Sequence, residues 1–296
     1  MATLSQWVAG ARPRTLPAAV APVVVGTAAA APLERASLGL ALLALLVSVS
    51  LQVGVNYAND YSDGIRGTDA DRVGPVRLVG QHKAKPENVK LMAFAFFGFA
   101  ALVGLALVAI SQAWVMVPLG ALAVVAAWRY TGGRNPYGYR GLGEVYVFLF
   151  FGLMATLGTL YTQAGRLTWV GLAGAVGIGA ITTAILVANN LRDIPTDRES
   201  GKLTLAVRMG DTGTRLLYAA LALVAAAMVV LIGIVHPVAW VSVLAFGLLW
   251  RPLQTLRSRA VGPALVPVLA ATGLFEIAYA VLLAAGIATS VAISGS

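Results

Sequence analysis

Two acidic segments contain the residues of this sequence that are best placed to do chemistry. The first, residues 59–71, follows the apolar run 38–55 closely and holds Asp60, Asp63 and two further aspartates, a third of the twelve acidic residues. Like charges at such short range repel one another, so this cluster is costly unless a cation binds it. A hard divalent ion with oxygen ligands, such as magnesium, is the simplest partner.

The second segment, residues 189–197, repeats the pattern Asn-x-x-x-Asp. Asn189 and Asp193 stand in it where Asn59 and Asp63 stand in the first. Residues four apart lie on one stripe of a helix, so each pair presents two oxygen donors on one face. The repetition indicates an internal duplication, with two metal-binding half-sites facing one cavity.

The two segments differ in how far the helix is expected to continue. Asp197 extends the second stripe by one more turn, but Pro195 predicts that the helix ends close to it. In the first segment the next acid, Asp69, comes two residues late, and Gly67 indicates that the chain has already turned there. The third ligand of each half-site is therefore expected to depart from a regular helix.

Composition places both segments in a membrane protein. Hydrophobic residues make up 59% of the chain and charged residues 11%, whereas a soluble domain carries about 25% charged residues. Apolar runs of about 20 residues, the length of a bilayer-crossing helix, recur along the chain. They predict an all-α, polytopic bundle of about nine transmembrane helices around a central cavity, forming a single domain over residues 1–296. The expected spans are residues 15–33, 37–58, 90–111, 113–130, 144–164, 168–190, 215–235, 237–250 and 267–292.

Basic residues lie almost entirely in the loops on one side of these spans. Of the 21 Lys and Arg residues, only Arg35 and Arg166 fall on the other side. The positive-inside rule therefore predicts a multi-pass protein of the cell (inner or plasma) membrane, with the N-terminus and both acidic segments in the cytoplasm and the C-terminus outside. The same bias accounts for the net charge of +9 without a nucleic-acid partner.

The acidic segments and the bases around them suit a diphosphate. Carboxylates can hold magnesium, which bridges to phosphate oxygens, while Lys and Arg neutralise the remaining charge. No Walker loop precedes Gly201-Lys202, so a nucleotide is not indicated. The diphosphate is better interpreted as the head group of a lipid whose tail lies between the helices.

Four blocks of sequence resemble the UbiA superfamily of intramembrane prenyltransferases, and the resemblance covers essentially the whole chain. They read NDYSDGIRGTD (59–69), GPVRLVG (74–80), YTGGRNPYGYRGLGE (130–144) and GKLTLAVRMG (201–210). Within the superfamily they are most similar to the menaquinone-pathway branch, the 1,4-dihydroxy-2-naphthoate polyprenyltransferases. The resemblance implies transfer of a polyprenyl group from an all-trans polyprenyl diphosphate to 1,4-dihydroxy-2-naphthoate. Carbon dioxide and diphosphate are lost, and the product is demethylmenaquinone.

The resemblance also implies roles for individual residues. The implied ligands of magnesium, of which two ions are expected and for which manganese can substitute, are Asn59, Asp63, Asp69, Asp193 and Asp197. The implied catalytic residues are Asp63, Asp69, Asp193, Asp197 and Lys202. The residues expected at the diphosphate or the aromatic substrate are Asn59, Arg72, Arg77, Tyr130, Arg134 and Asn189, with Arg77 at the naphthoate carboxylate.

Other interpretations stay open on the sequence alone. Within the superfamily, the acceptor could be another aromatic acid such as 4-hydroxybenzoate. A transporter would hold its ligands near the middle of the membrane, whereas these carboxylates cluster at its boundary. A CDP-alcohol phosphotransferase carries an Asp-Gly-x-x-Ala-Arg signature that the chain does not match at Asp63. Asp60 is either a site residue or a solvated loop acid, and Glu276 either acts in the site or bonds between helices.

Overall fold

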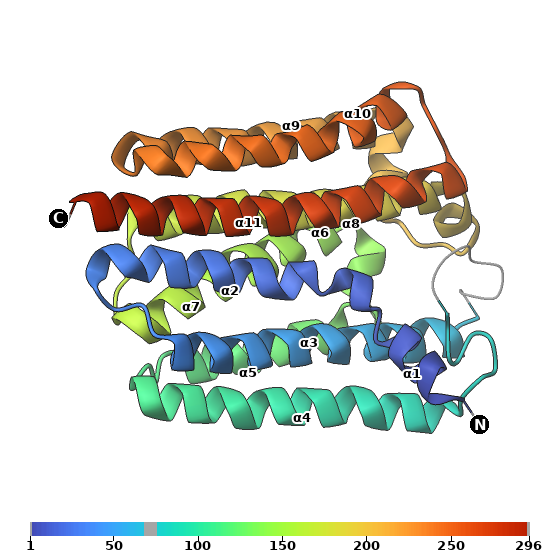
Figure 1. Ribbon diagram of the computed structural model, residues 1–296. Coiled ribbons are helices and arrows are strands. Elements are labelled where there is room, and N and C mark those ends of the chain that lie inside the picture. The colour runs from blue at the N-terminus through green and yellow to red at the C-terminus, as the bar shows by residue number, and fades with distance from the viewer. Residues whose placement is uncertain (1, 68–75, 295–296) are drawn as a thin grey trace.

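The computed structural model describes residues 2–67 and 76–294, and every regular element within these ranges is helical. The long helices lie side by side in a bundle, with the N-terminus and the C-terminus at opposite ends (Figure 1). The prediction of an all-α fold is confirmed for this part of the chain. Asp69 and Arg72, both expected in the site, lie outside the described residues.

The first half of the chain starts with a short helix and continues with longer ones. In order, its elements are α1 (Leu4–Gly10), η1 (Pro13–Thr15), α2 (Pro17–Ala30), η2 (Ala31–Leu33), α3 (Leu38–Ile65), α4 (Pro86–Ser111) and α5 (Met116–Arg129). Proline begins α2 and α4, where its missing N–H would have no helical partner. Ser37 caps α3, and its hydroxyl accepts from the Leu40 N–H at 3.4 Å.

The second half contains the longest helices. Its elements are η3 (Tyr137–Arg140), α6 (Gly143–Val147), η4 (Phe148–Met154), α7 (Ala155–Ala164), α8 (Trp169–Glu199), α9 (Leu205–Val235), η5 (Pro237–Leu249), α10 (Trp250–Arg257), η6 (Gly262–Leu265) and α11 (Val266–Ser294). α6, η4 and α7 follow one another without a break, and η4 is a π-helical segment, a rare form that is often found at functional sites.

α8 continues through Pro195, so the prediction that the helix ends there is wrong. Proline removes one backbone donor, but its fixed φ is itself compatible with a helix. The Thr196 hydroxyl donates to the Asp193 carbonyl at 3.1 Å. The helix ends only at Glu199, with Ser200 as its C-cap before Gly201 with φ +73°. Asp197 therefore lies one helical turn after Asp193.

The number of membrane spans differs from the prediction of nine. Among the described residues, six helices are long and apolar enough to cross a membrane, or seven if the bent pair Leu4–Thr15 and Pro17–Leu33 is one span. Two expected spans are short, because α5 has 14 residues and η5 has 13. A 3₁₀ helix rises about 2.0 Å per residue, so η5 extends about 26 Å, close to the ~30 Å of a bilayer core. The chain is a multi-pass membrane protein, and the count of nine is not confirmed.

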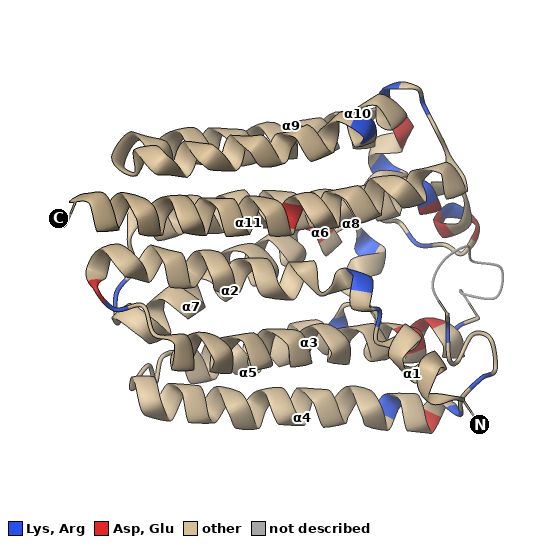
Figure 2. Cartoon of the chain, viewed as in Figure 1, with Lys and Arg blue, Asp and Glu red and all other residues tan. Residues whose placement is uncertain are grey.

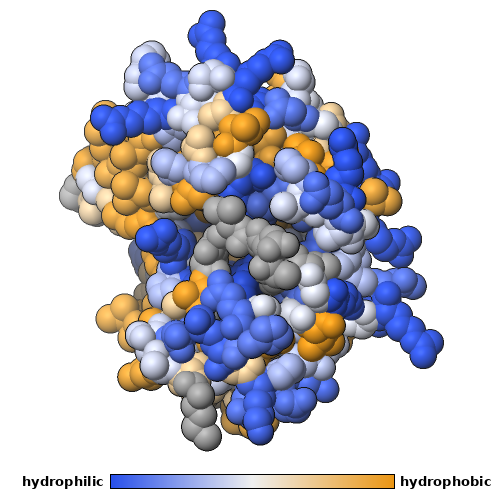
Figure 3. Space-filling view, turned by 90° about the vertical axis from the view of Figure 1, so that its right-hand side faces the viewer, coloured by the Kyte–Doolittle hydropathy of each residue, from blue (hydrophilic) through white to orange (hydrophobic). Residues whose placement is uncertain are grey.

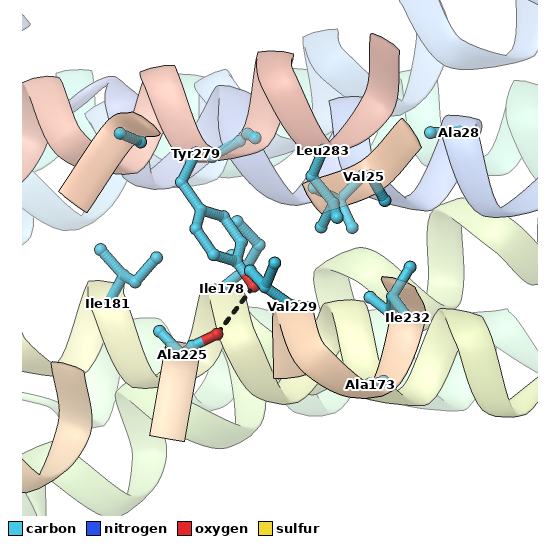
Figure 4. Close-up of a cluster of buried hydrophobic side chains, with 14 of the residues drawn as sticks. Val25, Ala28, Ala173, Ile178, Ile181, Ala225, Val229, Ile232, Tyr279 and Leu283 are labelled. Atoms are coloured by element: carbon cyan, nitrogen blue, oxygen red, sulfur yellow. Dashed lines mark hydrogen bonds between the residues drawn. The ribbon is translucent and has the colours of Figure 1, made fainter. Parts of the chain in front are cut away.

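The main apolar core packs between α2, α8, α9, η5 and α11. In Figure 4, the Tyr279 side chain reaches across this core, and its hydroxyl donates to the Ala225 carbonyl at 3.3 Å. η4 packs on α8 through backbone, since a Cβ at Gly152 would lie 2.3 Å from the Cα of Gly179. Such close approach between small residues is a common means of joining helices in a membrane.

Charge gathers at one end of the bundle. Most of the ribbon coloured for Lys, Arg, Asp and Glu lies at the end where α1 and α10 are found (Figure 2). Seen face on, this end is covered mainly by hydrophilic side chains (Figure 3). The C-terminal ends of α3 and α8, which carry Asp63 and Asp197, lie at this end (Figure 1).

Candidate active site

A cavity of about 590 Å³ lies within the bundle. Its walls come from α2, α3, α4, α5, α8 and the helical run from α6 to α7. Ala44 and Asp63 both line it, and at about 1.5 Å per residue along α3 they are about 28 Å apart. The volume is typical of a ligand pocket, and the length suits an elongated ligand.

Most of the cavity wall is apolar. α3, α4 and α5 supply aliphatic side chains, and η4 supplies Phe150, Phe151 and Met154. The aliphatic residues include Val47, Leu51, Val55, Leu105, Leu107, Val108, Val117 and Val124. α8 therefore has one face in the apolar core and the other on this cavity, because Ile181 belongs to the core and Leu186 lines the cavity.

The polar end of the cavity brings the two acidic segments together. Residues from both motifs line the same space, although about 130 residues of sequence separate them. The predicted site residues that line it are Asn59, Asp63, Arg77, Tyr130, Asn189, Asp197 and Lys202.

The connection between α5 and α6 holds the first motif in place. The Thr131 hydroxyl donates to Asn59 Oδ1 at 2.7 Å, and the Tyr139 hydroxyl donates to Asp63 Oδ1 at 2.5 Å. Lys202, from the segment after α8, places its Nζ 3.5 Å from Asp63 Oδ2. Both motif residues are buried, so each of these contacts is shielded from water.

The second motif has a different environment. Asp193 is buried, and both of its carboxylate oxygens accept from Arg192: Oδ1 from Nε at 2.7 Å and Oδ2 from Nη2 at 2.8 Å. Asn189 and Asp197 line the cavity, whereas Asp193 is not part of its wall. The proposed metal role of Asp193 therefore stays a prediction, since Arg192 occupies both oxygens in this structure.

Asp60 has a structural role. Its side chain is fully buried, and its carboxylate accepts from the N–H groups of Leu78 at 2.7 Å and Val79 at 3.0 Å. These bonds fix the backbone at Leu78 and Val79 and thereby hold the neighbouring residue, Arg77, in the cavity wall. Of the two alternatives for Asp60, the solvated loop acid is wrong.

Arg134 is exposed and does not line the cavity, so its predicted contact with diphosphate stays a prediction. Glu276 is fully buried and bonds to the Thr182 hydroxyl, which joins α11 to α8. Of the two alternatives for Glu276, the structure shows the bond between helices.

Several polar residues of the cavity were not expected from the sequence. Arg12, Gln52 and Asn56 line it, and Gln52 Nε2 donates to the Thr15 hydroxyl at 2.9 Å. Residues 52, 56, 59 and 63 follow one helical stripe, so polar residues inside an apolar run were an available signal. Thr131 and Tyr139, in contrast, meet the first motif only through the tertiary fold.

Aromatic side chains line the wall between the polar end and the apolar part. The Tyr130 and Tyr137 ring centroids are 5.5 Å apart, those of Tyr137 and Tyr146 3.8 Å, and those of Tyr146 and Phe150 6.0 Å. Burial raises the pKa of Tyr137, which therefore stays protonated and donates to the Ala126 carbonyl at 2.9 Å. All four rings line the cavity.

The donors at the polar end suit magnesium bound together with a substrate. Asn59, Asp63 and Asp197 offer hard oxygen ligands from both motifs, while Asn189 Oδ1 accepts from Arg192 Nη2 at 2.9 Å and so stands in support. Within residues 2–67 and 76–294, no three His, Asp or Glu side chains are close enough to form a metal cage by themselves. Magnesium commonly uses one or two carboxylates, waters and substrate phosphates rather than an all-protein cage. The residues present therefore fit the ion.

Comparison with known proteins agrees with this arrangement. The family model described as the UbiA prenyltransferase family matches residues 19–264. The chain belongs to this family. It is 53% identical over 97% of its length to a 1,4-dihydroxy-2-naphthoate octaprenyltransferase of Mycobacterium tuberculosis, of which it covers 98%. It is 40% identical over 73% of its length to the enzyme of the same name from Escherichia coli, of which it covers 72%.

Solved structures of UbiA homologues share the fold. One from Archaeoglobus fulgidus, bound to GPP and Mg2+, gives a TM-score of 0.64 at 16% identity, over 94% of this chain and 99% of the other. One from Aeropyrum pernix gives 0.67 at 14% identity over the full length of both chains. The family predicted from the sequence is confirmed.

Proposed function

We propose that this UbiA-family protein transfers a polyprenyl group from an all-trans polyprenyl diphosphate to 1,4-dihydroxy-2-naphthoate, with release of carbon dioxide and diphosphate. The shape of the cavity carries the proposal. An end rich in oxygen donors and cations leads into an apolar part, and the whole cavity extends about 28 Å along α3. A polyprenyl diphosphate is divided in the same way, into an anionic head and a long apolar tail. The choice of acceptor rests on relatives at 53% and 40% identity that bear that name.

The diphosphate head binds at the polar end in this proposal. Asn59, Asp63 and Asp197 hold magnesium there, with Asn189 in support, two ions as the full complement and manganese as a substitute. Magnesium supplies positive charge against the diphosphate as its bond to the tail breaks. Lys202 adds a cation that is already held in the site, since its ammonium group lies 3.5 Å from Asp63 Oδ2. Charges placed in advance stabilise a transition state without the cost of reorganisation.

The first carbons of the tail lie along the aromatic wall. Breaking the allylic C–O bond leaves positive charge on the tail, and the π faces of aromatic rings attract cations. Tyr130, Tyr137 and Tyr146 line the cavity between the acidic motifs and the apolar space. These rings also exclude water, which would otherwise capture the cation as an alcohol.

Arg77 and Arg12 bind the naphthoate carboxylate. Arg77 is buried, Arg12 is partly buried, and both line the cavity, so each can form charge-assisted hydrogen bonds with a carboxylate. The new C–C bond forms at the ring carbon that carries the carboxylate. Carbon dioxide then leaves without the electron pair of its bond, which restores the aromatic ring. This route removes no ring proton, and because no oxidant takes part, the direct product is the hydroquinone form of demethylmenaquinone.

The orientation in the membrane is part of the proposal. Both motifs and the N-terminus face the cytoplasm of a cell-membrane protein, and the C-terminus lies outside, as the distribution of Lys and Arg predicts. The chain has no cysteine, so single cysteines report on their own positions. Ser296→Cys is expected to react with an impermeant thiol reagent in intact cells, and Ser200→Cys only after lysis. The reverse labelling would contradict this orientation.

A product assay tests the function. Purified protein is supplied with magnesium, polyprenyl diphosphate and either 1,4-dihydroxy-2-naphthoate or 4-hydroxybenzoate, and products are identified by mass. We expect a prenylated naphthalenediol that has lost carbon dioxide, and no product in EDTA. A prenylated hydroxybenzoate that keeps its carboxyl group would assign the protein to another acceptor, and turnover in EDTA would contradict the magnesium site.

A further inference from the structure

Tyr139 contacts the first acidic motif and the segment that directly follows the second. Its hydroxyl donates to Asp63 Oδ1 at 2.5 Å, at the end of α3. Its carbonyl accepts from the Leu203 N–H at 3.0 Å, just after α8. Lys202 Nζ lies 4.6 Å from the centre of the Tyr139 ring and 3.5 Å from Asp63 Oδ2. One residue of the α5–α6 connection therefore joins segments that are far apart in the sequence.

Two further residues of the α5–α6 connection, Thr131 and Gly133, are hydrogen-bonded to the end of α3. Arg66, just after Asp63, donates to the carbonyls of Thr131 and Gly133, and its guanidinium carbon lies 5.4 Å from the centre of the Tyr139 ring. The ring thus has two cations within cation–π range, Arg66 of the first acidic segment and Lys202, five residues after Asp197. These contacts restrain the ring from both sides of the cavity end.

The hydroxyl of Tyr139 bonds to Asp63, whereas its ring contacts Lys202. A hydrogen bond from a hydroxyl to a carboxylate fixes the direction of the remaining lone pairs, and bonds to charged groups are stronger than neutral ones. The ring limits where the flexible Lys202 ammonium can lie. Without the hydroxyl, Asp63 Oδ1 loses this donor, and the existing ion pair with Lys202 competes more strongly with a metal ion for the carboxylate.

We propose that Tyr139 is a positioning residue that sets the spacing between the two acidic motifs, with its hydroxyl orienting Asp63 and its ring placing Lys202. The inference rests on the proposed function, because it treats Asp63 and Lys202 as parts of the diphosphate site. Two variants separate the groups: Tyr139→Phe loses only the hydroxyl, and Tyr139→Leu loses the ring as well. Tyr161 on α7, which does not line the cavity, provides matched control variants.

The first measurement needs neither metal nor turnover. Spin labels on Ile65→Cys and Ser200→Cys, two exposed positions after the motifs, report the distance between the segments in the otherwise cysteine-free chain. We expect a narrow distance distribution in the parent protein, in Tyr139→Phe and in Tyr161→Leu, and a distribution at least twice as broad in Tyr139→Leu. Equal widths in all four proteins would overturn the spacing role of the ring, whether or not the protein transfers prenyl groups.

The second measurement tests the hydroxyl. In Tyr139→Phe we expect half-maximal activity to need about ten times more magnesium, in line with loss of a hydrogen bond to a charged group. The KM for the aromatic acid should stay unchanged, and Tyr161→Phe should match the parent. An unchanged magnesium requirement in Tyr139→Phe overturns the role of the hydroxyl, and this variant keeps the test decisive if Tyr139→Leu does not fold. If the parent protein itself has no activity, the proposed function fails, while the label distances still decide the role of the ring.

Discussion

The two Asn-x-x-x-Asp motifs have the same spacing but different surroundings. In the first, Asn59 and Asp63 both line the cavity and accept hydrogen bonds from the α5–α6 connection. In the second, Asn189 lines the cavity, whereas Asp193 lies outside its wall with both oxygens on Arg192. Asp197, one turn later, takes the place at the cavity wall.

This difference shows what a repeated spacing can and cannot predict. Spacing places two side chains on one helical stripe, but the tertiary fold decides which of them reach the cavity. Arg192 binds both oxygens of Asp193 outside the cavity wall, whereas Asp63 belongs to the wall although Lys202 Nζ lies 3.5 Å from its Oδ2. Asp63 and Asp197 are therefore the expected working pair, and Asp193 is expected to serve the structure of α8.

The largest effect is expected from Asp63→Asn. The substitution keeps the volume of the side chain but removes a charge that is expected to hold magnesium against the departing diphosphate. We expect turnover to fall about a thousandfold, as for loss of a main electrostatic stabiliser. Steady-state assays on monodisperse protein measure the turnover of both proteins.

Lys85→Gln is the matched control for a change of one charge. Lys85 is exposed and precedes α4, away from the cavity wall. Surface substitutions of this kind usually change stability by less than about 0.5 kcal/mol, and we expect turnover within about threefold of the parent. An inactive Lys85→Gln protein beside an active Asp63→Asn protein would reverse the assignment of the first motif.

A smaller loss of turnover is expected from Asp193→Asn. Removing the carboxylate leaves the buried Arg192 guanidinium without its bidentate partner, and breaking a buried ion pair costs about 3–5 kcal/mol of stability. We therefore expect a clear fall in thermal stability and at most about a hundredfold fall in turnover of the folded protein. The double variant Arg192→Gln/Asp193→Asn should recover much of the stability. A thousandfold fall in turnover with unchanged stability would instead indicate that Asp193 is a magnesium ligand.

The sequence was sufficient for the parts of the site that depend on local spacing. Apolar runs predicted the long helices. The two stripes predicted that Asn59, Asp63, Asn189, Asp193 and Asp197 would face one cavity, and all of these except Asp193 line it. The helical continuation of α8 through Pro195 was missed, because proline costs one hydrogen bond but does not forbid the helical backbone.

The parts that the sequence did not predict depend on tertiary contacts. Nothing local to Tyr139 indicates that its hydroxyl meets Asp63, and nothing local to Asp60 indicates that it binds the backbone of Leu78 and Val79. The expected spans at 113–130 and 237–250 became a 14-residue α-helix and a 13-residue 3₁₀ helix. Hydropathy predicts that a segment is apolar but does not specify its helical pitch.

The smallest effect is expected at Glu276, a buried carboxyl on α11 about two helical turns from the second motif. Its partner Thr182 lies about 10 Å from Asn189 along α8, at 1.5 Å per residue. Glu276→Gln can still bond to Thr182, so we expect little change in stability, while Glu276→Leu should lose about 0.6–1.7 kcal/mol, the range for hydrogen bonds between membrane helices. Unfolding measurements in bicelles report both values. Loss of activity in a stable Glu276→Gln protein would place this carboxyl in the catalytic machinery.

Calorimetric titration of inorganic diphosphate into the parent protein, Asp63→Asn, Asp197→Asn and the double variant tests most directly whether the two motifs form one site. With magnesium present, we expect the parent to bind diphosphate, each single variant to bind at least about tenfold more weakly, and the double variant to bind no more weakly than either single one. Such non-additivity is the mark of residues that act together. In EDTA, the parent should not bind. Losses that multiply in the double variant, or full binding in EDTA, would contradict a shared metal–diphosphate site.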